Sequence, residues 1–201
     1  GARCLTTADL DGDAVPDIVT GNGGTEDGDS VSAMLGRGDG TMAERVDTPV
    51  GRLPISIVGA DLDEDGREDL VLSGDDKTVE VLAGGGDGTF SATAEYTRSW
   101  NLDMLAVGDF NGDGREDVAG RDASPRDKRV SVLLNDRGAL IERPEWIGWP
   151  GHIPTIICVS DCDADGVSDL VSVSTEDNRA SVIRGGWGGV TVYDIRTDRT
   201  L

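Results

Sequence analysis

Four segments of the chain carry acidic residues at a spacing that suits a hard divalent cation. Each has aspartate or asparagine at positions one, three, five and nine, and three of the four have glycine at position six. Carboxylates at alternate positions of a tight loop can face one centre, and a glycine allows the sharp backbone turn. The segments read DLDGDAVPD from Asp9, DLDEDGRED from Asp61, DFNGDGRED from Asp109 and DCDADGVSD from Asp161.

Calcium is the cation that this spacing favours, because it takes about six to eight oxygen ligands, including a peptide carbonyl at position seven. For a single copy, a solvated aspartate–glycine turn is the alternative. Four copies in register hold like charges close together, which a turn alone leaves unexplained. We therefore predict up to four Ca²⁺ ions, held by these side chains and position-seven carbonyls: Asp9, Asp11, Asp13, Val15 and Asp17; Asp61, Asp63, Asp65, Arg67 and Asp69; Asp109, Asn111, Asp113, Arg115 and Asp117; and Asp161, Asp163, Asp165, Val167 and Asp169.

The segments do not continue as EF-hand or dockerin loops, which need an acidic ligand at position twelve. Position twelve is here uncharged: Thr20, Leu72, Gly120 and Ser172. Two copies also depart from the pattern, because Ala14 stands in place of the glycine and Asn111 in place of an aspartate. We therefore expect the loops at Asp61 and Asp161 to bind the cation most tightly.

The segments recur with a period of about 50 residues, which indicates a repeat protein. They start at residues 9, 61, 109 and 161, so that the steps are 52, 48 and 52 residues. Each follows an apolar run and precedes an apolar pair, an alternating stretch and a glycine turn, and helical periodicity is absent. Four short strands per repeat predict an all-β fold, a β-propeller built of four-stranded antiparallel blades. We place one repeat domain over 1–201, with four blades at about 1–50, 51–99, 100–148 and 149–201.

The chain resembles the FG-GAP/VCBS repeat of integrin-α-like calcium-binding β-propellers. The resemblance rests on an apolar strand followed by D-x-D-x-D-G-x-x-D, LVL and VLAGGGDGTF, and it covers essentially the whole chain. It implies a calcium ion in the loop between the first and second strands of each blade. It also implies ligands bound at the opposite face or between blades, and, because the family includes lectins and adhesion receptors, a glycan or a protein as the ligand.

Composition excludes some partners and leaves candidate ligand contacts. The net charge of −21 repels nucleic acid and anionic membranes, and no apolar run approaches the length of a membrane span. Exposed indoles beside polar groups suit a sugar ring, although packing between blades is the alternative for the tryptophans. The candidates, in the segments that join successive blades, are Trp100, Asn101, Trp149 and His152.

These observations predict a secreted or cell-surface, calcium-stabilised propeller that binds a glycan or an extracellular protein. We expect no catalysis, because the chain has one histidine and lacks the common catalytic motifs. The alternatives are an accessory propeller of a secreted carbohydrate-active enzyme or toxin, and a scaffold without its own ligand. No strand is left to latch four blades into a ring, so we expect a homodimer that completes an eight-bladed ring, in preference to a longer single-chain propeller.

Overall fold

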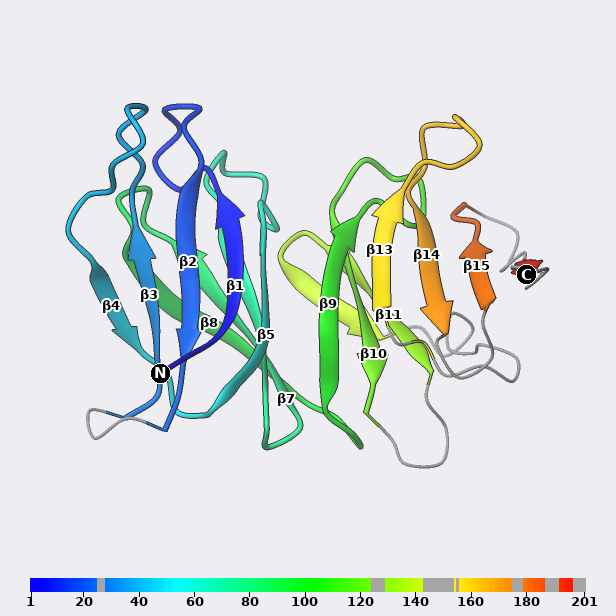
Figure 1. Cartoon of the computed structure of the whole chain (residues 1–201), viewed down its shortest axis with the longest axis horizontal. Coiled ribbons are helices and arrows are strands. Elements are labelled where there is room, and N and C mark those ends of the chain that lie inside the picture. Colours follow the sequence, from blue (N-terminus) through cyan, green and yellow to red (C-terminus); the bar gives the residue numbers. More distant parts are fainter. Residues whose placement is uncertain are drawn as a thin grey trace, which may run out of the picture. The chain divides into compact units, whose positions relative to one another are not determined.

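The computed structural model of the chain is built from antiparallel sheets (Figure 1). It describes residues 1–24, 28–123, 129–142, 154, 156–174, 179–186 and 192–196, with the backbone alone for 179 and 192–196. These described residues form strands, turns and irregular segments without a helix. Within the same residues, no helix long and apolar enough to cross a membrane occurs.

Each of the four sheets contains four strands in chain order. The strands of sheet 1 are β1 (Ala2–Ala8), β2 (Asp17–Asn22), β3 (Ser30–Met34) and β4 (Val46–Pro49). Sheet 2 has β5 (Pro54–Ala60), β6 (Asp69–Gly74), β7 (Thr78–Gly84) and β8 (Phe90–Thr97). Sheet 3 has β9 (Leu102–Gly108), β10 (Asp117–Asp122), β11 (Val130–Asp136) and β12 (Ala139–Glu142). Sheet 4 has β13 (Ile156–Ser160), β14 (Asp169–Ser174), β15 (Arg179–Ile183) and β16 (Val192–Arg196).

The predicted all-β chain of four-stranded antiparallel sheets is confirmed, and the sheets are consistent with propeller blades. Strands that are neighbours in sequence are neighbours in each sheet, as expected for short connections. The closed ring stays a prediction. The chain folds as two compact units, Gly1–Leu105 and Ala106–Leu201, and each has its own hydrophobic cluster.

Because side chains alternate along a strand, each sheet has two faces. We call front the face that carries Ile57 in sheet 2 and Ile157 in sheet 4, and back the face that carries Val19 in sheet 1 and Ala119 in sheet 3, with the equivalent faces of the other sheets named alike. In the first unit, one cluster joins the back face of sheet 1 to the front face of sheet 2: Val19, Val31 and Ala33 with Ile57, Leu70, Leu72 and Leu82. In the second unit, the other joins the back face of sheet 3 to the front face of sheet 4: Ala119, Val130 and Val132 with Ile157 and Leu170. The two units therefore repeat one mode of sheet-on-sheet packing.

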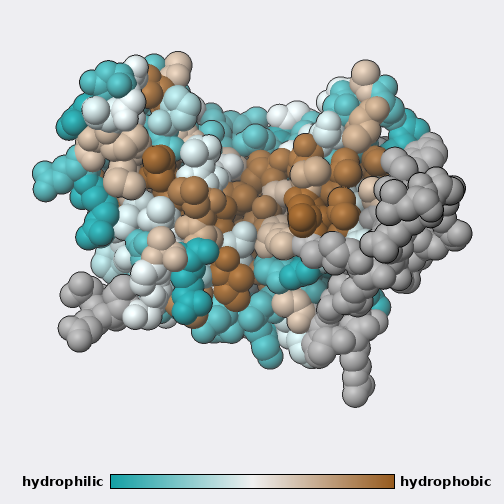
Figure 2. All heavy atoms as spheres, in the orientation of Figure 1, coloured by the Kyte–Doolittle hydropathy of each residue, from teal (hydrophilic) through white to brown (hydrophobic). Residues whose placement is uncertain are grey.

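Some hydrophobic side chains reach the surface on strands that begin a sheet. Leu5 on β1 and Ile156 on β13 are 63% and 55% exposed. The space-filling view shows hydrophobic residues at the surface in the regions of these strands (Figure 2). Where sheets stack, a neighbouring sheet usually covers such side chains, because exposure of apolar area to water is unfavourable.

Candidate metal centres

Each acidic loop joins the first and second strands of a sheet, where the resemblance implies that it should lie. The first strand ends one residue before position one of the loop, and the second strand begins at position nine. Ala8 pairs with Asp17 and Ala60 with Asp69, so that the antiparallel ladder closes the two ends of the loop. The loop is therefore held at the rim of the sheet by the strands that it connects.

The position-one carboxylate caps the turn. In the first loop, Asp9 Oδ1 accepts from the N–H groups of Gly12 at 2.9 Å and Asp13 at 3.1 Å, and Oδ2 accepts from Ala14 at 2.9 Å. The other three loops repeat the bonds to positions five and six at 2.7 to 3.1 Å. The position-five carboxylate accepts in turn from the N–H of position seven, as Asp13 does from Val15 at 2.8 Å. These bonds orient the carboxylates before any cation is present.

Three of the loops gather carboxylates at a spacing that fits calcium. In each, three ligand oxygens lie within 4.8 Å of one another. Oxygens on opposite sides of a calcium ion are about 4.6–5.2 Å apart, because each lies at about 2.3–2.6 Å from the metal. All donors are hard oxygens, which calcium prefers to nitrogen or sulfur. The three groups are Asp9, Asp11 and Asp13; Asp61, Asp63 and Asp65; and Asp161, Asp163 and Asp169.

The third loop differs because of its asparagine. Asn111 Nδ2 donates to Asp113 Oδ2 at 3.0 Å, and Arg115 Nη2 donates to the same oxygen at 2.6 Å. Its amide oxygen accepts from the N–H of Asp113 at 2.8 Å. Among the described residues, this loop forms no group of three carboxylates like those above. A cation here would have to share or replace the existing partners of Asp113.

The position-nine aspartates form buried clamps, a role that sequence reasoning missed. Their exposed fractions are 0 to 4%. One oxygen accepts from the N–H at position two, and the other from an N–H near the end of the third strand. Asp17, for example, accepts from Leu10 and Gly36, each at 2.7 Å. The equivalent clamps are Asp69 with Leu62 and Gly84, Asp117 with Phe110 and Asn135, and Asp169 with Cys162 and Gly185.

Burial and neighbouring negative charges raise the pKa of several of these carboxyl groups. Burial, together with the negative charges of Asp113 and Asp109, raises the pKa of Asp117 to about 6, against two backbone hydrogen bonds that lower it. The pKa of Asp69 is also raised, again chiefly by burial. Desolvation, followed by the charges of its neighbours, raises the pKa of Asp11. A bound cation would favour the ionised forms of all three groups.

Two positions of every loop have a left-handed backbone, where a Cβ atom costs about 1–2 kcal/mol. At position six, the φ angles are 64° for Ala14, 84° for Gly66, 86° for Gly114 and 87° for Gly166. At position four, they are 76° for Gly12, 62° for Glu64, 77° for Gly112 and 60° for Ala164. The first, second and fourth loops thus contain one strained residue each. Strain at Ala14 therefore does not distinguish the first loop from the second and fourth loops. It gives no reason to expect weaker calcium binding in the first loop.

Arginines already pair with some of the loop carboxylates. Besides Arg115, Arg67 Nη1 lies 3.4 Å from Asp65 Oδ2. Arg184, beyond the third strand of sheet 4, contacts Asp163 and lies 3.9 Å from Asp165 Oδ2. These partly exposed pairs contribute little to stability, but each places a positive charge where a cation would bind. Arg184 lies far from its loop in sequence, so the repeat pattern gave no sign of it.

The candidate ligand residues lie partly within the described chain. Trp149 and His152 fall outside it. Trp100 is 44% exposed, and Lys77 Nζ lies 5.8 Å from its ring centroid. Asn101 Nδ2 donates to the backbone oxygen of Asp75 at 3.3 Å. The structure therefore brings Trp100 and Asn101 together beside the β6–β7 turn, at the end of sheet 2 remote from its acidic loop.

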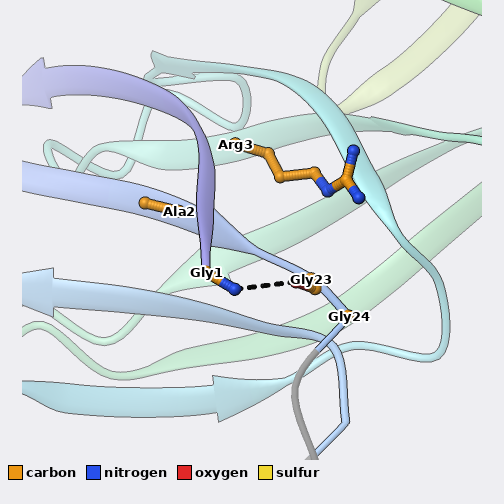
Figure 3. A pocket seen from close by; sticks show the side chains of 5 residues that line it. All are labelled: Gly1, Ala2, Arg3, Gly23 and Gly24. Atoms are coloured by element: carbon orange, nitrogen blue, oxygen red, sulfur yellow. Dashed lines mark hydrogen bonds between the residues drawn. The ribbon is translucent and has the colours of Figure 1, made fainter.

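A shallow hollow near the chain start has a volume of about 530 Å³ (Figure 3). It is lined by Gly1, Ala2, Arg3, Gly23 and Gly24. Two of these residues are bonded to each other, because the Gly1 amino group donates to the Gly23 oxygen at 2.9 Å. Arg3 carries the only ionisable side chain among these five residues, so the hollow shares nothing with the acidic loops.

A family model described as an FG-GAP-like repeat matches three overlapping segments, residues 9–72, 61–120 and 109–172. The chain belongs to the FG-GAP-like repeat family. Each match runs from position one of one acidic loop to position twelve of the next, so the FG-GAP-like period is the loop period. The family resemblance seen in the sequence is confirmed. No curated protein sequence matches this FG-GAP-like chain significantly.

Solved structures of low sequence identity share the fold. BBS1N in complex with ARL6DN is 15% identical with a TM-score of 0.65, and the alignment covers 98% of this chain and 55% of that one. A protein from Lactobacillus plantarum is 16% identical with a TM-score of 0.63, covering 99% and 57%. A putative 6-phosphogluconolactonase from Bacteroides uniformis is 13% identical with a TM-score of 0.64, covering 98% and 55%. The chain spans a little over half the length of these structures.

Proposed function

We propose that this chain is a calcium-binding β-propeller module in which ions held by the acidic loops stabilise the fold. One observation carries the proposal: three loops each gather three carboxylates with ligand oxygens within 4.8 Å of one another. Bound ions would offset the repulsion between these groups and would stabilise the native state by mass action. The ligand atoms come from residues one, three, five and nine, and the position-seven carbonyl stays a predicted ligand.

Thermal unfolding in calcium, magnesium or excess EDTA tests this proposal. We expect calcium to raise the melting temperature well above that in EDTA, with magnesium less effective because it demands a tighter octahedral shell. Asp63→Asn should reduce the calcium effect. Asp136→Asn removes a carboxylate that is exposed at the end of β11 and outside the loops, so it is the matched control. Superimposable melts in calcium and EDTA would sink the proposal.

We further propose that the surface around Trp100 binds a glycan or an extracellular protein. An exposed indole beside Asn101 and the β6–β7 turn offers both an apolar face and hydrogen-bonding groups, which suits a sugar ring. A protein ligand is supported by a structural neighbour, because BBS1N is described in complex with ARL6DN. Arrays of glycans and of extracellular proteins, probed with the parent and with Trp100→Ala, test the assignment. Ligands bound equally by both would place recognition elsewhere.

The proposal assigns no catalytic role and places the chain outside the cell. Calcium sites in extracellular modules often have dissociation constants of about 10⁻⁴–10⁻³ M, which match the calcium available there. Fractionation of the source cells would test this placement: recovery of the protein in the cytosol alone would contradict it.

A further inference from the structure

The front face of sheet 1 is exposed, although the equivalent front faces of sheets 2 and 4 are each buried against the preceding sheet. Aligning the sheets on their first loop aspartates makes Leu5, Ile57 and Ile157 equivalent. Ile57 is 4% exposed and Ile157 is 9% exposed, each inside a cluster formed with the preceding sheet. Leu5 is 63% exposed. The face that receives a neighbour in sheets 2 and 4 is therefore uncovered in sheet 1.

The back face of sheet 4 also lacks a sheet that covers it. Val171 is equivalent to Val19 and Ala119, both fully buried against a following sheet, yet Val171 itself is only half-buried. Along the same face, Ile156 and Val173 are 55% and 40% exposed. The back face of sheet 4 thus presents the apolar residues that sheets 1 and 3 use to bind the next sheet.

The described side chains of both faces are almost uncharged, in a chain of net charge −21. On the inner three strands of the sheet 1 front face, the side chains are aliphatic or hydroxyl and amide groups without a carboxylate. Three of the polar ones form a hydrogen-bonded row: Thr20 donates to Asn22, Asn22 Nδ2 donates to Ser32 Oγ at 2.7 Å, and Ser32 donates to Asp47. A partner sheet could cover this row without leaving these three side chains unpaired.

We propose that the front face of sheet 1 binds the back face of sheet 4 of a second copy of this chain. Each copy carries both faces, so two copies can meet head to tail and cover both. The contact would repeat the packing already present between sheets 1 and 2 and between sheets 3 and 4, driven by burial of the same apolar positions.

The internal contacts predict the register of this interface. A Cβ atom placed on Gly59 of sheet 2 would lie 3.1 Å from Ala8 Cβ of sheet 1. One placed on Gly108 of sheet 3 would lie 2.8 Å from Val159 Cγ1 of sheet 4. In both pairs, the last residue of the first strand of one sheet meets the next-to-last residue of the first strand of the following sheet. The corresponding pair across the interface is Ser160 of one copy and Thr7 of the other.

The molecular mass in solution is the first test. Light scattering in millimolar calcium should give twice the chain mass of 21.0 kDa. Leu5→Asp should raise the dissociation constant by about tenfold or more, because it puts a charge into the interface. The variant should still fold, since Leu5 is exposed within one chain. Ile141→Asp, at a residue 39% exposed on β12, is the control and should leave the mass unchanged. A parent chain of 21.0 kDa at all accessible concentrations would overturn the proposal.

Directed disulfide formation is the second test, made in a background lacking Cys4, Cys158 and Cys162, which are all free. Thr7→Cys with Ser160→Cys should oxidise to a covalent dimer, because the equivalent Gly59 and Ala8 positions bring two Cβ atoms to 3.1 Å, which a small shift widens to the 3.5–4.5 Å that a disulfide needs. Thr7→Cys with Cys158 retained is the control, since Cys158 lies two residues away, about 7 Å along the strand. A disulfide formed within single chains would show that sheet 4 covers sheet 1 of its own chain. No disulfide, or equal yields from both pairs, would also overturn the proposal.

Discussion

Replacement of Asp17 by asparagine should destabilise the first loop even without metal. Both carboxylate oxygens accept a backbone N–H at 2.7 Å, from Leu10 and Gly36, and the side chain is fully buried. Asparagine keeps one acceptor but turns an NH₂ donor toward the second N–H. A hydrogen bond to a charged group contributes about 1.5–3 kcal/mol, and a buried unpaired donor costs about 1–3 kcal/mol. We therefore expect the free energy of unfolding to fall by about 2–4 kcal/mol.

Urea denaturation in excess EDTA, followed by circular dichroism, measures this loss separately from metal binding. Asp11→Asn is the matched control, because Asp11 is exposed and accepts one N–H, from Asp13 at 3.3 Å. Its midpoint in EDTA should stay that of the parent, although calcium should stabilise it less. If Asp17→Asn also unfolds at the parental midpoint in EDTA, the position-nine aspartates are not structural clamps and the reasoning fails.

Three further substitutions probe the loops. Ala14→Gly should raise the free energy of unfolding in EDTA by about 0.5–1 kcal/mol, because the φ angle of 64° no longer strains a Cβ atom; a lower melting temperature would contradict this. Asn111→Asp should tighten calcium binding to the third loop by adding a carboxylate, and an unchanged titration isotherm would count against that loop as a site. Arg115→Gln should also tighten binding severalfold, since it removes a positive charge 2.6 Å from Asp113 Oδ2; weaker binding would show that Arg115 helps to shape the site.

The repeat architecture was predictable because its cues are local. The loop spacing, the apolar pair that follows each loop and the alternating stretch before the glycine turn each fix one strand or turn without help from distant residues. Position six was recognised as a special backbone site from its glycines. Position four was not, because Glu64 and Ala164 occupy it in two copies and carry no sign of a left-handed turn.

The roles of the four aspartates in a loop could not be separated by sequence. Position nine looks like positions one, three and five by residue type, yet it begins the second strand and is buried. The second partner of Asp17, Gly36 beyond β3, is 19 residues away in sequence and is brought near only by the pairing of β2 with β3. The Arg184 contact with Asp163 depends on tertiary structure in the same way. The division into two units also has no counterpart in the repeat pattern.

The number of calcium ions bound per chain tests the central claim most directly. Equilibrium dialysis against millimolar calcium, with metal and protein measured in the same sample, gives this number. We predict at least three ions, one for each carboxylate group, and a fourth if the third loop also binds. Asp63→Asn and Asp163→Asn should each remove about one ion, and Asp136→Asn none. A chain that binds no calcium above the dialysis background, or whose bound calcium is unaffected by the loop substitutions, would contradict the account.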